Sequence, residues 1–205
     1  MIGRDNCRYP WSHPDGPDEP SVPFHGVIYP DGHPWDVGEV KALLGDMAFA
    51  ALEAKVFRVE YFDGPFMTRK KTSLSPRIDF DLGDEPGSGS PDASAGIGKD
   101  DFSIRWTGRL VAPAAGTYVL HGDCDGLPRL WLDGKLVLDK DDHRRRDVQG
   151  EVELAAGQSY QVKVDYVHRD GAASNHVPWS GSRFAKQVLR LDGVAAAKGG
   201  GRPRP

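Results

Sequence analysis

The stretch RLWLDGKLVLD, residues 129–139, places an apolar run on each side of the dipeptide Asp133-Gly134. A two-residue hairpin turn of type I′ requires a positive φ angle at both central residues, and Asp-Gly adopts it readily. We therefore expect a β-hairpin here. On either side of it, large apolar residues alternate with polar ones in segments 57–61, 102–107 and 160–166. Strands of this kind bury one face and expose the other, which predicts an all-β fold of antiparallel sheets.

The composition agrees with many short strands joined by turns. The 205 residues include 25 glycines and 16 prolines, which argues against a helical bundle. The formal net charge of −4 argues against a general nucleic-acid-binding surface, because phosphate binding needs a basic one. No apolar run approaches the roughly 18 residues that span a bilayer, so we expect no membrane span. The first residues lack the apolar core of a secretory signal peptide, and none is expected in this chain.

The composition also divides the chain into four regions. Residues 36–55 predict one short helix, which begins with the capping-box pair Asp36 and Glu39. Residues 56–191 hold the strands, with a long flexible loop at 83–100, and residues 192–205 predict a flexible Gly/Arg/Pro tail. Residues 1–35 hold seven of the sixteen prolines and predict an extended arm. A proline-rich arm rarely carries this many aromatic residues unless it lies along its own domain or along a neighbour. The residues expected to contact a partner are Trp11, Phe24, Tyr29 and Trp35.

Several motifs of the strand region follow one another in a characteristic order. They are VEYFDGPF (59–66), IDFDLG (78–83), RWTG (105–108), AGTY (115–118), LWLDGK (130–135) and AGQSY (156–160). Their order and spacing resemble the PA14 domain family, and the resemblance covers residues 56–191. It implies an antiparallel β-sandwich of the kind found in adhesins, toxins and glycosidases. Trp106 and Trp131 lie in alternating strands and are expected in the core.

The resemblance also implies a candidate metal site. Its sugar-binding members hold Ca²⁺ with two adjacent aspartates and, from a later loop, an asparagine side chain and two main-chain carbonyls. Together with two sugar hydroxyls or waters, five such oxygens complete the six to eight ligands that Ca²⁺ takes. In this chain Cys124 separates the two aspartates, which departs from the family pattern. The residues that correspond to the metal ligands are Asp123, Asp125, Asn175, Val177 and Trp179.

The same segments would hold the carbohydrate. Asp123 and Asp125 would contact sugar hydroxyls, while His176 or Trp179 would stack on the apolar face of the ring. The alternative is a polar rim without an ion, in which the two aspartates form a turn before Gly126.

Two further features leave alternatives open. Arg144, Arg145 and Arg146 follow an acidic run, and they predict either a solvated loop with internal ion pairs or a contact with a protein partner. Cys7 and Cys124 are either two free thiols or one disulfide. No nucleophile motif, phosphate-binding loop or zinc signature occurs, and no pair of carboxylates stands out, so an enzyme is not expected.

These features lead to two hypotheses for the function of the chain. The first is a non-enzymatic recognition module at an extracellular, cell or particle surface, binding a glycan with Ca²⁺ in adhesion. The second is a structural or assembly subunit of a capsid, filament or surface layer. Here the arm of residues 1–35 would dock on protein neighbours in a homo- or hetero-assembly.

Overall fold

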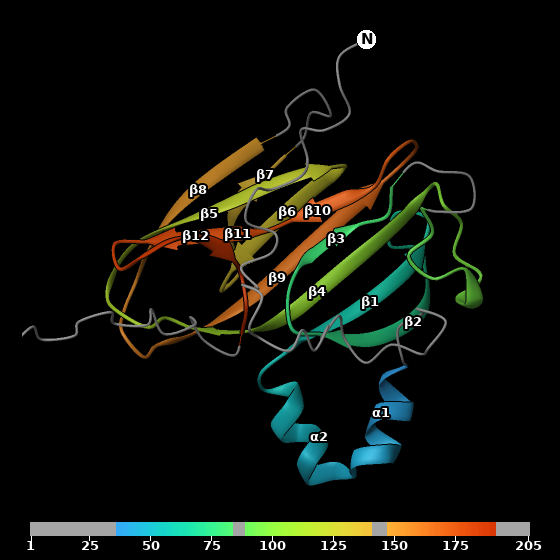
Figure 1. The fold of residues 1–205 in the computed structure, drawn as a ribbon, viewed down its shortest axis with the longest axis horizontal. Helices are drawn as coiled ribbons and strands as arrows, with labels where there is room; N and C mark the ends of the chain where they lie inside the picture. The colour runs from blue at the N-terminus through green and yellow to red at the C-terminus, as the bar shows by residue number, and fades with distance from the viewer. Residues whose placement is uncertain (1–35, 84–88, 141–146, 192–205) are drawn as a thin grey trace, which may run out of the picture.

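The computed structural model describes residues 36–83, 89–140 and 147–191. Over these residues, two six-stranded sheets form in which all paired strands run antiparallel (Figure 1). The first sheet has the order β2-β1-β4-β9-β6-β7, with the bounds β1 Phe57–Asp63, β2 Thr68–Ser75, β4 Phe102–Val111, β6 Leu127–Leu132, β7 Lys135–Asp139 and β9 Ser159–His168. The second has the order β12-β11-β5-β10-β3, with β8 also paired to β5, and the bounds β3 Asp79–Asp81, β5 Gly116–Asp125, β8 Asp147–Leu154, β10 Ser174–His176, β11 Pro178–Gly181 and β12 Phe184–Val188. The predicted all-β, antiparallel sandwich is confirmed.

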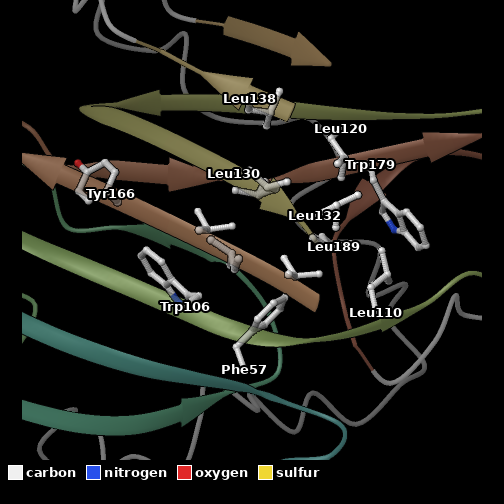
Figure 2. Packing of buried hydrophobic residues seen from close by; sticks show 14 of the residues in the cluster. Phe57, Trp106, Leu110, Leu120, Leu130, Leu132, Leu138, Tyr166, Trp179 and Leu189 are labelled. Atoms are coloured by element: carbon white, nitrogen blue, oxygen red, sulfur yellow. The ribbon is translucent and has the colours of Figure 1, made fainter. Parts of the chain in front are cut away.

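One apolar core lies between the two sheets, because alternate side chains of both point inward. Phe57, Trp106 and Tyr166 enter it from the first sheet, and Leu120 and Trp179 enter it from the second (Figure 2). Burial of this many large apolar side chains is the main force that holds the sheets face to face. The alternation predicted for residues 102–107 is seen in β4 from Ile104 to Thr107, and the burial pattern of β5 alternates in the same way.

Trp131 departs from the predicted core. It takes a half-buried, outward-facing position of β6, because its buried neighbours Leu130 and Leu132 point inward. The Nζ atom of Lys163 lies 3.9 Å from the centre of the Trp131 ring, which makes a cation–π contact on the outer face. The prediction that Trp131 is a core residue was therefore wrong, whereas the one for Trp106 is confirmed.

The predicted single helix is two helices. They are α1, Val37–Leu44, and α2, Asp46–Glu53. Gly45 separates them with a φ of 75°, a positive value that a right-handed helix does not allow and that glycine adopts readily. The capping box is present as expected, since the Asp36 side chain accepts a hydrogen bond from the N3 amide and Glu39 accepts one from the Asp36 amide.

Two turns show how local sequence agrees with the fold. In the β6–β7 hairpin, Asp133 and Gly134 have φ angles of 46° and 79°, as the predicted type I′ turn requires. The predicted flexible loop at 83–100 is ordered over residues 89–100 and contains a short 3₁₀ helix, Ala93–Ala95. Asp92 caps this helix and is buried with Ile97, and Lys71 Nζ lies 2.7 Å from its carboxylate.

Several predictions lie outside the described residues. These are the arm with Trp11, Phe24, Tyr29 and Trp35, the arginines Arg144, Arg145 and Arg146, the tail, and Cys7. Cys124 is a free, buried thiol. Over the described ranges, neither helix is long and apolar enough to cross a bilayer.

Candidate functional site

The structure brings the acidic pair and the asparagine segment side by side. Strand β10 pairs with the last residues of β5, so that Ser174 lies opposite Asp125, Asn175 opposite Cys124, and His176 opposite Asp123. Residues about fifty positions apart in the sequence therefore meet at one end of the second sheet.

The two segments meet with their oxygen donors on different faces. Cys124 points into the sandwich, so Asp123 and Asp125 on either side of it point out. Directly opposed residues of an antiparallel pair share a face, which places the Asn175 side chain inside with Cys124. Asn175 is 0% exposed. Its amide therefore does not point to the side on which the two carboxylates lie.

The expected carbonyl donors also have other partners. The Val177 carbonyl accepts a hydrogen bond of 3.0 Å from the Leu189 amide. Trp179 pairs with β5 through Leu120 and with β12 through Gln187. Both residues thus lie in backbone that pairs within the second sheet. The predicted side-chain donors Asp123, Asp125 and Asn175 lie on two faces of this sheet.

The two side chains expected to stack on sugar are engaged elsewhere. The Trp179 ring is buried and stacks on Tyr118, with 5.2 Å between ring centres, so it contributes to the core and is not open to a sugar. The Nδ1 atom of His176 lies 2.5 Å from a carboxylate oxygen of Asp79 on β3.

A buried lysine, which the sequence analysis did not consider, lies behind the acidic pair. Lys140 is 2% exposed, and its Nζ donates a hydrogen bond of 2.6 Å to the carbonyl of Cys124. The same Nζ lies 3.7 Å from the Cys124 sulfur. Burial raises the pKa of this thiol to about 12, so it is a neutral group at physiological pH.

The same end of the sandwich carries a pocket of about 390 Å³. It lies where β5 and β9 end and where the chain turns back into β10. We call it the rim pocket, and its lining residues are Asp125, Gly126, His168, Arg169, Asp170 and Ala172. Only Asp125 was among the predicted site residues. The signal for the others was present in the polar run His168-Arg169-Asp170-Gly171, which follows directly on an alternating strand.

One buried histidine of the rim pocket has several carboxylates around it. His168 is 2% exposed, and its ring centre lies 4.9 Å from that of Phe102. Burial lowers the pKa of His168, although nearby carboxylates, led by those of Asp100 and Asp170, oppose the shift. The imidazole is therefore neutral at pH 7 and able to accept a hydrogen bond. No His, Cys, Asp or Glu side chains gather in threes as a metal site over residues 36–83, 89–140 and 147–191.

A comparison with protein-family models matches residues 87–193 to the PA14 domain, which is more than half of the chain. This chain belongs to the PA14 domain family. Among curated proteins, the PA14 chain is similar to the anti-sigma-I factor RsgI3 of Acetivibrio thermocellus, with 35% identity over 134 residues. That match covers 64% of this chain and 20% of RsgI3.

Solved structures give the same fold. An anti-sigma factor domain-containing protein superposes with a TM-score of 0.62 and 32% identity, over 74% of this chain and 50% of that one. A PA14 sugar-binding domain from an RTX adhesin superposes with a TM-score of 0.53 and 18% identity, over 66% of this chain and 95% of that one, which shows a shared fold. The PA14 chain thus spans a fifth of RsgI3 and half of the anti-sigma factor structure.

Proposed function

We propose that the PA14 chain is a carbohydrate-recognition module at a cell or particle surface, and that the rim pocket is its binding site. The observation that carries the proposal is a pocket of about 390 Å³ with charged side chains at the end of a rigid sandwich. Its volume lies at the lower end of the range of small-molecule sites, roughly 300–1,000 Å³. The sugar-binding fold of the RTX adhesin domain supports the assignment.

The lining residues suit a polyhydroxylated ligand. The carboxylates of Asp125 and Asp170 accept hydrogen bonds from sugar hydroxyls, and the Arg169 guanidinium donates them. Gly126 leaves room at the pocket wall because it has no side chain. These groups bind a ligand without any bond being made or broken, so the proposed role is recognition and not catalysis.

A glycan array with the purified chain tests this proposal. We expect binding to a defined set of glycans, and a loss of about tenfold or more in affinity for Arg169→Ala, because a charged donor is removed from the ligand. Arg109→Ala is the matched control, since Arg109 is exposed at the opposite end of β4 from the pocket and the change in charge is the same. If no glycan binds, or if both variants bind equally well, the proposal fails.

A second role is favoured by the anti-sigma factor matches. Their 35% and 32% identities exceed the 18% identity to the RTX adhesin domain. In this role the chain would be the ligand-sensing part of a longer regulatory protein and would act through a protein partner. A pull-down with the purified chain tests this role. Capture of a protein partner that the rim-pocket variant Arg169→Ala or an added glycan weakens supports it, and an absence of any captured protein counts against it.

The assembly role predicted from the sequence depends on residues 1–35 and on Arg144, Arg145 and Arg146, which lie outside the described residues. Removal of residues 1–35 tests it, because the sandwich would stay folded while any homo- or hetero-assembly is lost.

A further inference from the structure

The side-chain donors predicted for a calcium ion lie on two faces of the second sheet. Ca²⁺ takes six to eight oxygens at roughly 2.3–2.6 Å. In this chain the carboxylates of Asp123 and Asp125 lie on the outer face of β5, while the Asn175 amide lies inside. A single ion cannot contact donors on both faces of one sheet, because the backbone of β5 lies between them.

The interior side of this strand pair already holds a positive charge. The Lys140 ammonium lies 2.6 Å from the carbonyl of Cys124, the residue between the two aspartates. Asn175 is the cross-strand partner of Cys124, so its amide lies on the same interior side. A divalent cation placed here would meet a like charge in a region of low dielectric constant, where repulsion is strong.

The ammonium is held firmly at this place. The Lys140 amide donates a hydrogen bond of 3.1 Å to the carbonyl of Pro128, which anchors the backbone beside β6. No carboxylate of the described residues forms an ion pair with Lys140. The acidic groups of β5 that flank Cys124 are Asp123 and Asp125, and both lie on the other side of the strand.

The Asn175 amide is a second polar group on this interior side. It is fully buried, and neither its nitrogen nor its oxygen has a hydrogen-bond partner among the described residues. An amide in this position needs a small polar neighbour, and a buried water would meet that need without a metal.

From these observations we infer that this PA14 domain folds and binds its ligand without calcium, and that the buried ammonium of Lys140 supplies the positive charge behind the acidic pair. The binding half of this inference rests on the proposed carbohydrate role, whereas the folding half does not.

Thermal unfolding of the full chain tests the folding half directly. We expect the same melting temperature, within about 1 °C, in about 5 mM CaCl₂ and in excess EGTA, because a ligand raises stability only if it binds the folded state. A larger rise of the melting temperature in the calcium buffer overturns the inference.

For a glycan found on the array, affinity must also be equal in the two buffers. Binding that requires calcium overturns the inference but leaves the carbohydrate role intact, and an absence of glycan binding affects only that role.

A double-mutant cycle tests the part played by Lys140. Lys140→Met keeps the length of the side chain and removes its charge, and Asp125→Asn removes one carboxylate. We expect the drop in melting temperature of the double variant to be smaller than the sum of the drops of the two single variants. The reason is that the Asp125 carboxylate no longer stabilises the fold once the ammonium is removed. Additive shifts contradict the role of Lys140. If Lys140→Met does not fold, Lys140→Arg keeps the charge, and its melting temperature must respond to Asp125→Asn as that of the wild-type chain does.

Discussion

The phenol of Tyr166 donates a hydrogen bond to the main-chain carbonyl of Asp125. This contact joins the end of β9 in one sheet to the end of β5 in the other. Tyr166 is fully buried, and Asp125 lines the rim pocket. The backbone of the rim pocket is thus supported from below by the core of the sandwich, which allows the pocket to keep its shape without a ligand.

Removal of this hydroxyl should weaken both the fold and the site. For Tyr166→Phe we expect a loss of about 1–2 kcal/mol in the free energy of unfolding, because the ring still fills its place while a buried carbonyl loses its donor. Urea unfolding measures the loss. Tyr160→Phe is the control on the same strand, since its hydroxyl accepts a bond from Ala155 at an exposed position, and it should cost less. Equal costs would contradict the supporting role of Tyr166.

Gly126 should tolerate no side chain. Its φ is 121°, and a Cβ atom there would lie 2.3 Å from a ring carbon of Tyr166. We expect Gly126→Ala to cost more than about 3 kcal/mol, because backbone strain adds to a clash with a buried ring. Gly134→Ala separates the two effects, since Gly134 also has a positive φ but has no atom within 4 Å of the added carbon. It should cost about 1 kcal/mol. Calorimetry of both variants measures the difference.

Stability should fall in acid as Asp92 is protonated. Burial alone would raise the pKa of this carboxyl, but hydrogen bonds from Lys71 and Ser94 and the charge of Lys71 lower it below its ordinary value of 3.8. A pKa that is lower in the folded state stabilises the fold above the unfolded pKa, and this contribution is lost as the pH falls through the folded pKa. Asp92→Asn should therefore be less stable than the wild-type chain at pH 7.

The difference between these two chains should shrink below about pH 4. Guanidinium unfolding at a series of pH values shows the trend, and a constant difference across the series would contradict it. Asp139→Asn is a suitable control, because Asp139 is exposed and pairs with the exposed Arg129.

The rim pocket should prefer neutral sugars to acidic ones. Asp125 and Asp170 line it, and the charges of Asp100 and Asp101 also reach His168, against the single guanidinium of Arg169. A uronic acid brings a further carboxylate into this negative field, so we expect it to bind several-fold more weakly than the corresponding neutral hexose. Asp170→Asn should reduce this difference in affinity between the two sugars, and high salt should reduce it as well. Titration calorimetry with glucose and glucuronic acid provides the comparison, in which a preference for the acid would refute the expectation.

Much of the fold was predictable because its signals are local. The Asp133-Gly134 turn has the φ angles that its dipeptide favours, and Asp36 and Glu39 form the expected capping box. The helix prediction missed the break at Gly45, since one glycine inside a helical pattern does not show whether the chain continues or bends. For Trp131, the alternation predicted a strand correctly but did not settle which of its faces meets the second sheet.

The candidate site was less predictable because it depends on register. Side chains alternate along a strand, so a shift of one residue moves each of them to the other face. The spacing of Asp123, Asp125 and Asn175 along the chain says nothing of the register between β5 and β10. The rim pocket likewise needs the ends of two strands from different sheets. Lys140 reaches the Cys124 carbonyl only because the chain after β7 packs beside β5.

The sequence by itself determined that the strands are antiparallel, because alternating apolar residues and turn dipeptides act over a few neighbouring positions. The resemblance of its ordered motifs to the PA14 family implied the sandwich. Only the tertiary structure decided which face each polar residue takes. The reason is that the pairing of Asn175 with Cys124 is selected by the packing of both sheets around a single core, and this packing placed the amide and the lysine inside and the carboxylates outside.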